Sequence, residues 1–126
     1  MATTYFTVEE ANALLPQITP LLKMLSEVYH AITVKAGEIE PYVAQKAAGN
    51  GGHPEGGAFI LQLEQLSQGI NRVQSFGCLI KDIGSGLIDF PSLKDGREVY
   101  LCFRLGEEKI EFWHDIDTGF AGRQPL

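Results

Sequence analysis

Basic residues, cysteines and long apolar runs are all scarce in this sequence. The chain has 10 Lys and Arg residues against 16 Asp and Glu residues, a net charge of −6, and its basic residues are scattered singly. Phosphate binding needs a concentrated basic patch, so the composition argues against a nucleic-acid partner. No apolar run approaches the roughly 18 residues that span a bilayer, so we expect no membrane partner.

The two cysteines, Cys78 and Cys102, exclude further classes of protein. They do not form a secreted disulfide framework, and they lack the paired spacing of a zinc motif. The segment from Met1 to Phe6 lacks the basic and apolar regions of a signal peptide, so we expect a cytoplasmic location. Walker loops, dinucleotide fingerprints and nucleophile elbows are also missing, which removes the usual signatures of catalysis.

Two long helical patterns fill the first two-thirds of the chain. Apolar residues recur at three- and four-residue steps through residues 11–43, which predicts an amphipathic helix. A glycine-rich loop is predicted at residues 47–57. A second helix is predicted at residues 59–80, where the spacing resembles a coiled-coil seam and Gly77 indicates close approach of a bulky group. The two helices should form an antiparallel hairpin over about residues 7–83.

The first helix has a clear start and an interrupted middle. Thr7 and Glu10 have the spacing of a capping box, in which each side chain accepts a hydrogen bond from the other residue's amide. Pro16 and Pro20 lack the amide proton that a helix interior needs. We therefore expect a short helix to about Leu15, followed by a kink or a restart.

The last third of the chain is predicted to form a β-hairpin. Residues 99–104 and 109–114 are rich in β-branched and aromatic residues. Gly106 between them suits the first central position of a type II′ turn. Residues 87–90 add a third short strand, which Pro91 should stop.

These elements predict an α+β fold in a single domain of residues 1–126, with the β-hairpin and the tail over about residues 86–126. A helical hairpin with a long, kinked first helix is followed by a small antiparallel sheet of two to three strands. Residues 18–46 as a helix would span about 43 Å, whereas a compact chain of this size has a radius of gyration of about 14 Å. So small a sheet cannot cover the whole apolar seam, and we expect a homodimer built on the helices.

The predicted hairpin register divides the strand residues between two faces. The register pairs Tyr100 with Trp113 and Cys102 with Glu111. The core face then carries Val99, Leu101, Phe103, Ile110, Phe112 and His114. The other face is polar and aromatic, and it carries Tyr100, Cys102, Arg104, Lys109, Glu111 and Trp113.

The polar face is the candidate ligand- or partner-binding site. Arg104 can recognise an anion there and Glu111 an amine or hydroxyl. The alternative is a solvated salt bridge between Arg104 and Glu111. In the tail, Arg123 and the backbone amides near Gly119 can bind an anion, or the segment is a tight turn that packs Phe120 into the core.

The end of the hairpin is the candidate metal site. Glu111, His114, Asp115 and Asp117 are four residues with ligand groups, but strand alternation places Glu111 and His114 on opposite faces. The candidate ligands of a divalent metal ion are therefore His114, Asp115 and Asp117. The alternative is a hydrogen-bonded His114 at the edge of the core.

Three motifs make the chain similar to a known family: Tyr5-Phe-Thr-Val-Glu-Glu-Ala-Asn-Ala-Leu-Leu-Pro16, Gly86-Leu-Ile-Asp-Phe-Pro91, and Phe112-Trp-His with Gly119-Phe-Ala-Gly-Arg123. Over essentially its whole length the chain resembles the small prokaryotic family catalogued as domain of unknown function 2203. Family members often read Leu-Cys-Trp where this chain has Leu101-Cys102-Phe103. The resemblance implies a cytoplasmic location and a layout of helical hairpin then strands, and it supplies no activity.

Two functional hypotheses follow from the sequence. The favoured one is a non-enzymatic binding or assembly module that forms a homodimer through its helices. Its sheet face would bind a protein partner or a small anionic ligand. The alternative is a small metal- or ligand-dependent enzyme with its site at the C-terminal end of the β-hairpin.

Overall fold

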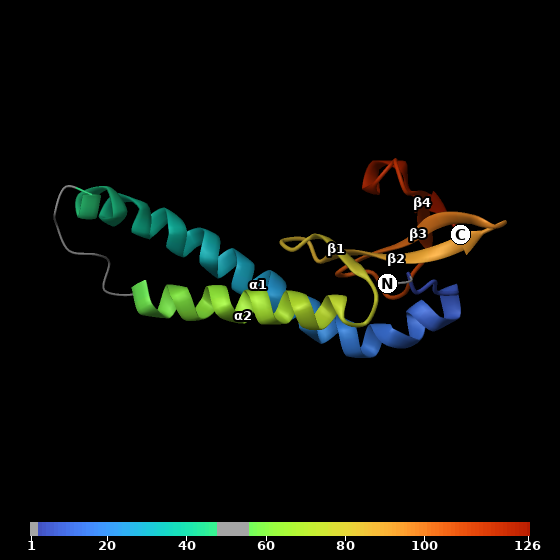
Figure 1. The fold of residues 1–126 in the computed structure, drawn as a ribbon, viewed down its shortest axis with the longest axis horizontal. Coiled ribbons are helices and arrows are strands. Elements are labelled where there is room, and N and C mark those ends of the chain that lie inside the picture. Colours follow the sequence, from blue (N-terminus) through green and yellow to red (C-terminus); the bar gives the residue numbers. More distant parts are fainter. Residues whose placement is uncertain (1–2, 48–55) are drawn as a thin grey trace.

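A computed structural model of the chain has two helices followed by an antiparallel sheet, which confirms the α+β class (Figure 1). It describes residues 3–47 and 56–126, so most of the predicted glycine loop lies outside the described residues. The sheet has five strands in the order β1-β2-β3-β4-β5, more than the two to three predicted. The elements are α1 (Val8–Ala47), α2 (Gly56–Gln74), β1 (Leu79–Asp82), β2 (Leu87–Lys94), β3 (Arg97–Arg104), β4 (Phe112–Asp115), the 3₁₀ helix η1 (Phe120–Gly122) and β5 (Gln124–Pro125).

The start of α1 is fixed by the predicted capping box. The Thr7 amide donates to Glu10 Oε1 at 2.9 Å, and the Glu10 amide donates to Thr7 Oγ1 at 3.1 Å. Of the two alternatives expected after Leu15, the restart is wrong, because α1 continues as one helix of 40 residues through Pro16 and Pro20. Both prolines are exposed, and Figure 1 shows the axis of α1 changing direction within its blue N-terminal part. A helix can bend at exposed prolines without ending.

Helix α2 is shorter than predicted, and the difference gives the sheet an extra strand. It ends at Gln74, and β1 begins at Leu79, where the helix was predicted to continue. The Gly77 amide donates to the Gln74 carbonyl at 3.0 Å, and Gly77 has a φ of 106°, a conformation that terminates helices. A Cβ at Gly77 would lie 2.8 Å from Phe6 Cζ. The predicted close approach of a bulky group to Gly77 is confirmed, and the group is the Phe6 ring of the N-terminal segment.

Helices α1 and α2 lie side by side and run in opposite directions, past the end of the sheet (Figure 1). They approach closely at Gly69, where a Cβ would lie 2.5 Å from Leu25 Cδ2. We call the part beyond the sheet, residues 31–47 of α1 and 56–64 of α2, the helical arm. Within residues 3–47 and 56–126, neither helix is both long and apolar enough to cross a membrane.

Strand β2 runs through Pro91, where the sequence predicted that it stops. Asp95 and Gly96, both with positive φ, form the two-residue turn to β3. Counting back from this turn, Pro91 and Tyr100 form a pair without ladder hydrogen bonds, so the Pro91 nitrogen faces away from β3. On that outer side the Phe6 amide donates to the Pro91 carbonyl at 2.8 Å.

Strand β4 pairs with β3 one residue out of the predicted register. The prediction pairs Tyr100 with Trp113, whereas the structure pairs Tyr100 with His114 and Leu101 with Trp113. A slip of one residue turns every side chain of a strand to the other face. Trp113 therefore lies in the core, and His114 shares the opposite face with Tyr100 and Cys102.

The register differs because the connection between β3 and β4 is longer than a two-residue turn. It spans residues 105–111. The Arg104 amide donates to Glu107 Oε1 at 2.6 Å, which turns the chain out of the sheet. The buried Ile110 then packs in the core, and its amide donates to Asn12 Oδ1 of α1 at 2.8 Å. Contacts with a helix far away in the sequence thus override the local preference for a tight turn.

The core lies between α1 and one face of the sheet. Its buried side chains come from both layers: Ala11, Leu15, Ile18, Leu22 and Leu25 from α1, and Ile88, Phe90, Val99, Leu101, Phe103 and Trp113 from the sheet. Figure 1 shows the helices on one side of the sheet and η1 on the other. The second face is therefore covered by the C-terminal tail instead of by a helix layer.

Candidate functional site

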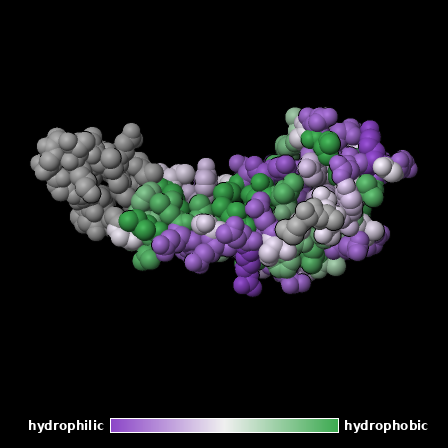
Figure 2. Space-filling model, viewed as in Figure 1, coloured by the Kyte–Doolittle hydropathy of each residue, from purple (hydrophilic) through white to green (hydrophobic). Residues whose placement is uncertain are grey.

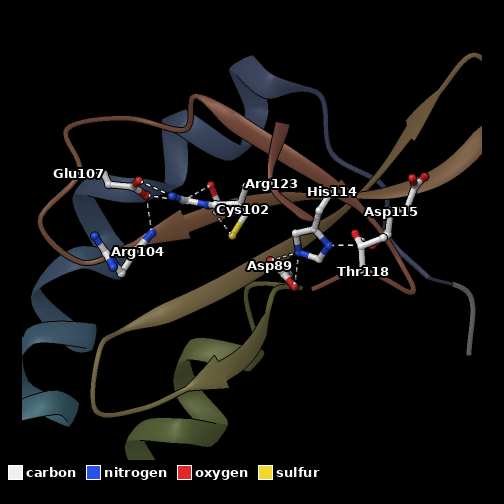
Figure 3. A network of polar contacts seen from close by, with 8 residues as sticks. All are labelled: Asp89, Cys102, Arg104, Glu107, His114, Asp115, Thr118 and Arg123. Carbon is white, nitrogen blue, oxygen red and sulfur yellow. Dashed lines mark hydrogen bonds and ion pairs between the residues drawn. The ribbon is translucent and has the colours of Figure 1, made fainter. Parts of the chain in front are cut away.

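The sheet face opposite the core carries a buried polar cluster. The register places Asp89 opposite Cys102 and His114 opposite Tyr100, and all four point to this face. Asp89, Cys102 and His114 have exposed fractions of only 1%, 0% and 2%. The C-terminal tail and the β3–β4 connection add one charged residue each. We call the cluster the polar site, with Asp89, Cys102, Glu107, His114 and Arg123 as its members (Figure 3).

Hydrogen bonds on both ring nitrogens fix the orientation of His114. Nδ1 lies 2.7 Å from the Asp115 carbonyl oxygen, which can only accept, so Nδ1 carries a proton and donates it. Nε2 lies 3.0 Å from each carboxylate oxygen of Asp89. One proton is shared between Nε2 and the carboxylate, and the pair is neutral as a unit. This neutrality matters because an isolated charge would be costly at a site so deeply buried.

Cys102 is a buried thiol between Asp89 and Arg123. Burial raises its pKa to about 11, the hydrogen bond from Arg123 opposes that rise, and the nearby Asp89 charge adds to it. Arg123 Nε donates to Sγ at 3.3 Å. The thiol is therefore protonated at neutral pH. His114 Nε2 is held by Asp89 and is not free to deprotonate it, so this group lacks the features of an activated nucleophile.

A paired arginine and glutamate fasten the C-terminal tail to the sheet. Arg123 Nη1 donates to Glu107 Oε2 at 2.8 Å and Nη2 donates to Oε1 at 2.7 Å, a bidentate arrangement. The guanidinium lies over the rings of Phe112 and Phe120, at 4.3 and 4.6 Å from their centroids. Burial opposes ionisation of Glu107, but the hydrogen bonds from Arg123 and the Arg104 amide hold its pKa below the ordinary value.

The structure brings several of the predicted site residues together. Cys102, His114 and Arg123 all belong to the polar site, and the Tyr100 ring lies 5.5 Å from the His114 ring between centroids. Arg104 lies at its edge, exposed, with its guanidinium 5.4 Å from the centroid of Phe120. The tail does not fold Phe120 into the core, since its ring is partly exposed beside the two arginines.

Other predicted residues lie elsewhere. Trp113 is buried in the core, which corrects its assignment to the binding face. Glu111 is exposed outside β4, and its pairing with Arg104 is not among the ion pairs of the residues described. The Asp115 carboxylate pairs with Arg97 at 3.2 Å and points away from His114 (Figure 3). Asp117 is exposed.

Two members of the polar site were not identified from the sequence. Asp89 stands between the apolar residues Ile88 and Phe90 in a predicted strand, and a carboxylate at such a position is a signal of a buried polar contact. Glu107 stood at the tip of the predicted turn, where an acidic residue is unremarkable. Glu107 belongs to the polar site because of its ion pair with Arg123, a residue 16 positions later in the chain.

Asp89, Cys102 and His114 present three different ligand atoms to one point. A carboxylate oxygen, Sγ and Nε2 lie within 4.8 Å of one another. Asp89 and His114 can share a proton through their hydrogen bond, or the three residues can hold a metal ion that replaces that proton.

The comparison with known proteins identifies a family. No curated protein and no solved structure gives a significant match. A family profile described as an uncharacterized conserved protein matches residues 4–126, nearly the whole chain. The chain therefore belongs to the DUF2203 family of uncharacterized conserved proteins, the family that its sequence motifs indicate.

Proposed function

We propose that this protein is a non-enzymatic binding and assembly module that forms a homodimer through its helical arm. The proposal depends on large apolar side chains that lie exposed on the arm. Val34 is 64% exposed, and Ile60, Leu61 and Leu63 are 57%, 66% and 41% exposed. Figure 2 shows apolar surface, in green, on the coloured part of the helices between the grey residues and the sheet. Contiguous exposed apolar surface is typical of an association site.

The length of the helices supports pairing with another molecule. At 1.5 Å per residue α1 is about 60 Å long, whereas a compact chain of this size has a radius of gyration of about 14 Å. The sheet therefore covers only part of α1. Among the residues that the structure describes, α1 packs on α2 beyond the sheet. Two such arms packed together would form a four-helix arrangement that covers the exposed apolar side chains.

The charge on α2 supports a second copy as the partner. Within the arm, residues 56–64 of α2 carry a single charged residue, Glu64, although the chain carries a net charge of −6. Two copies of this part of α2 can therefore approach with little like-charge repulsion. A twofold contact also uses the same patch on both chains, so one pairing covers the arm of each copy.

The second part of the proposal concerns the sheet face opposite the core, which we call the outer face. Arg104 is exposed beside the Phe120 ring, an arrangement that suits a protein partner or a small anionic ligand. Arg123 is already neutralised by Glu107, so Arg104 is the better anion-binding group. We place the protein in the cytoplasm, where free thiols such as Cys78 and Cys102 stay reduced.

Analytical ultracentrifugation over a dilution series tests the dimer. The variant Leu61→Glu removes an exposed apolar side chain and adds a charge, and we expect it to weaken dimerisation by at least about tenfold. Gln68→Glu is the control, because it adds the same charge at an exposed position two turns nearer the sheet. A wild-type chain that stays monomeric at every concentration contradicts the proposal. Equal weakening by both variants contradicts the apolar contact at Leu61.

A second candidate function is a small metal-dependent enzyme with its site at the end of the β-hairpin. The observation that favours it is the meeting of Asp89, Cys102 and His114 beside the tail. Metal binding itself can be tested without knowing a reaction.

A further inference from the structure

We propose that Asp89, Cys102 and His114 bind one divalent metal ion of the zinc class. This inference is separate from the proposed dimer and from the proposed binding of a partner or anion at the outer face, and it depends on neither of them. It follows from the geometry of the three ligand atoms, from the groups that orient them and from their combined charge.

The sheet itself holds the three ligands together. Asp89, Cys102 and His114 come from β2, β3 and β4, three neighbouring strands at the centre of the sheet. Asp89 and Cys102 are directly opposite each other, and His114 lies diagonally from Cys102. Their ligand atoms lie within 4.8 Å of one another, so side-chain rotations that bring them about 1 Å closer would let one ion bind all three at bond lengths of about 2.0–2.3 Å.

Neighbouring groups already orient two of the ligands as in known metal sites. Histidines that bind metals almost always donate the other ring N–H to a carbonyl or carboxylate, which fixes the tautomer. His114 Nδ1 donates in this way to the Asp115 carbonyl, so Nε2 is the nitrogen that faces Asp89 and Cys102. Arg123 Nε donates to Cys102 Sγ, a hydrogen bond that would stabilise a metal-bound thiolate.

Charge balance fits a divalent ion. The proton-sharing pair of Asp89 and His114 is neutral, and the Cys102 thiol is neutral. An entering ion of charge +2 displaces two protons to solvent, one from the thiol and one from the shared position. The site then holds a carboxylate, a thiolate and a neutral imidazole, and its total charge remains zero. The Arg123–Glu107 pair beside it is also neutral, so no uncompensated charge is buried.

The ligand set selects the class of metal. A thiolate excludes Mg²⁺ and Ca²⁺, which prefer oxygen ligands, whereas imidazole, thiolate and carboxylate together suit Zn²⁺. Co²⁺ accepts the same ligands and is visible by optical spectroscopy, so it is a suitable probe. Three protein ligands also leave one tetrahedral position for a further small ligand.

Titration of the chelator-treated full-length chain with Co²⁺ is the first test. We expect one ion per chain and a thiolate-to-cobalt charge-transfer absorption, both reversed by Zn²⁺. Cys102→Ser should abolish this absorption, and His114→Gln or Asp89→Asn should weaken binding by at least about tenfold. Cys78→Ser is the matched control, since Cys78 is equally buried but belongs to the core cluster, where its thiol donates to the Val73 carbonyl.

X-ray absorption of the zinc-loaded wild-type chain provides a test that no folding defect can obscure. We expect one sulfur ligand at about 2.3 Å, with nitrogen and oxygen at about 2.0–2.1 Å. Absence of stoichiometric binding, a spectrum without sulfur, or a charge-transfer absorption that persists in folded Cys102→Ser overturns the proposal. None of these outcomes bears on the dimer, which the dilution series tests separately.

Discussion

At the scale of single residues, Gly77 determines how the chain turns from α2 into β1. Gly77 combines a positive φ with close contact to the Phe6 ring, which itself packs edge-on against Phe90 with 5.2 Å between centroids. A side chain at this position therefore meets two obstacles at once. One is backbone strain in the left-handed region, and the other is a ring that its neighbours hold in place.

We predict that Gly77→Ala lowers the free energy of unfolding by roughly 2–4 kcal/mol, the sum of strain and overpacking. Gly96→Ala separates the two causes, because Gly96 also has a positive φ but a Cβ there would meet nothing within 4 Å. That variant should lose only about 1 kcal/mol. Urea unfolding of both proteins gives the comparison. Equal losses in the two variants would show that Phe6 moves aside freely.

At the scale of elements, the C-terminal tail depends on the bidentate pair of Arg123 and Glu107. Glu107 has a lowered pKa in the folded protein, so its contribution to stability is complete above its ordinary pKa of about 4.3 and is lost as the pH falls through the lower folded value. We predict that Glu107→Gln costs about 1–2 kcal/mol at pH 7 and much less at pH 3. Urea unfolding at the two pH values measures this difference.

The neighbouring Glu108 provides the control for the tail prediction. It is exposed, and the same change to glutamine there should leave stability and its pH dependence nearly unchanged. If Glu107→Gln behaves like Glu108→Gln at pH 7, the ion pair does not hold the tail. Hydrogen exchange of the tail amides would then locate the contacts that do.

The elements whose signals are local were predictable from the sequence. The capping box at Thr7 and Glu10 and the strand at β3 depend on neighbours in the chain. The register of β4 does not, because it is set by the Ile110 amide and Asn12, which are 98 positions apart. The end of α2 was missed for a related reason. The apolar spacing continues past Gly77 into β1, where Ile80 packs on the same core.

The polar site was only partly predictable, because it depends on that register. Alternation along β3 correctly grouped Tyr100, Cys102 and Arg104. The one-residue slip placed His114 in the core and Trp113 on the polar face, the reverse of the structure. With His114 predicted on the core face, its contact with Asp89 of β2 could not be predicted.

At the scale of the whole molecule, the sheet with the helices packed on it and the helical arm differ in how far their apolar side chains are buried. The core cluster lies between the sheet and α1, whereas the exposed Val34, Ile60, Leu61 and Leu63 lie on the arm. We therefore expect residues 57–64 of the arm to open locally more easily than β2 and β3, which lie at the centre of the sheet. A partner that covers the arm would suppress this opening by mass action.

We predict that amide hydrogen exchange in residues 57–64 slows at least severalfold as the protein concentration is raised through the dimerisation range. The amides of β2 and β3 should exchange slowly and equally at every concentration, because the core protects them with or without a partner. Leu61→Glu should keep the arm in fast exchange throughout, whereas Gln68→Glu should follow the wild-type chain. Arm exchange that does not change with concentration, while ultracentrifugation detects dimers, would place the dimer contact on another surface. The outer face of the sheet around Arg104 would then be the next surface to test.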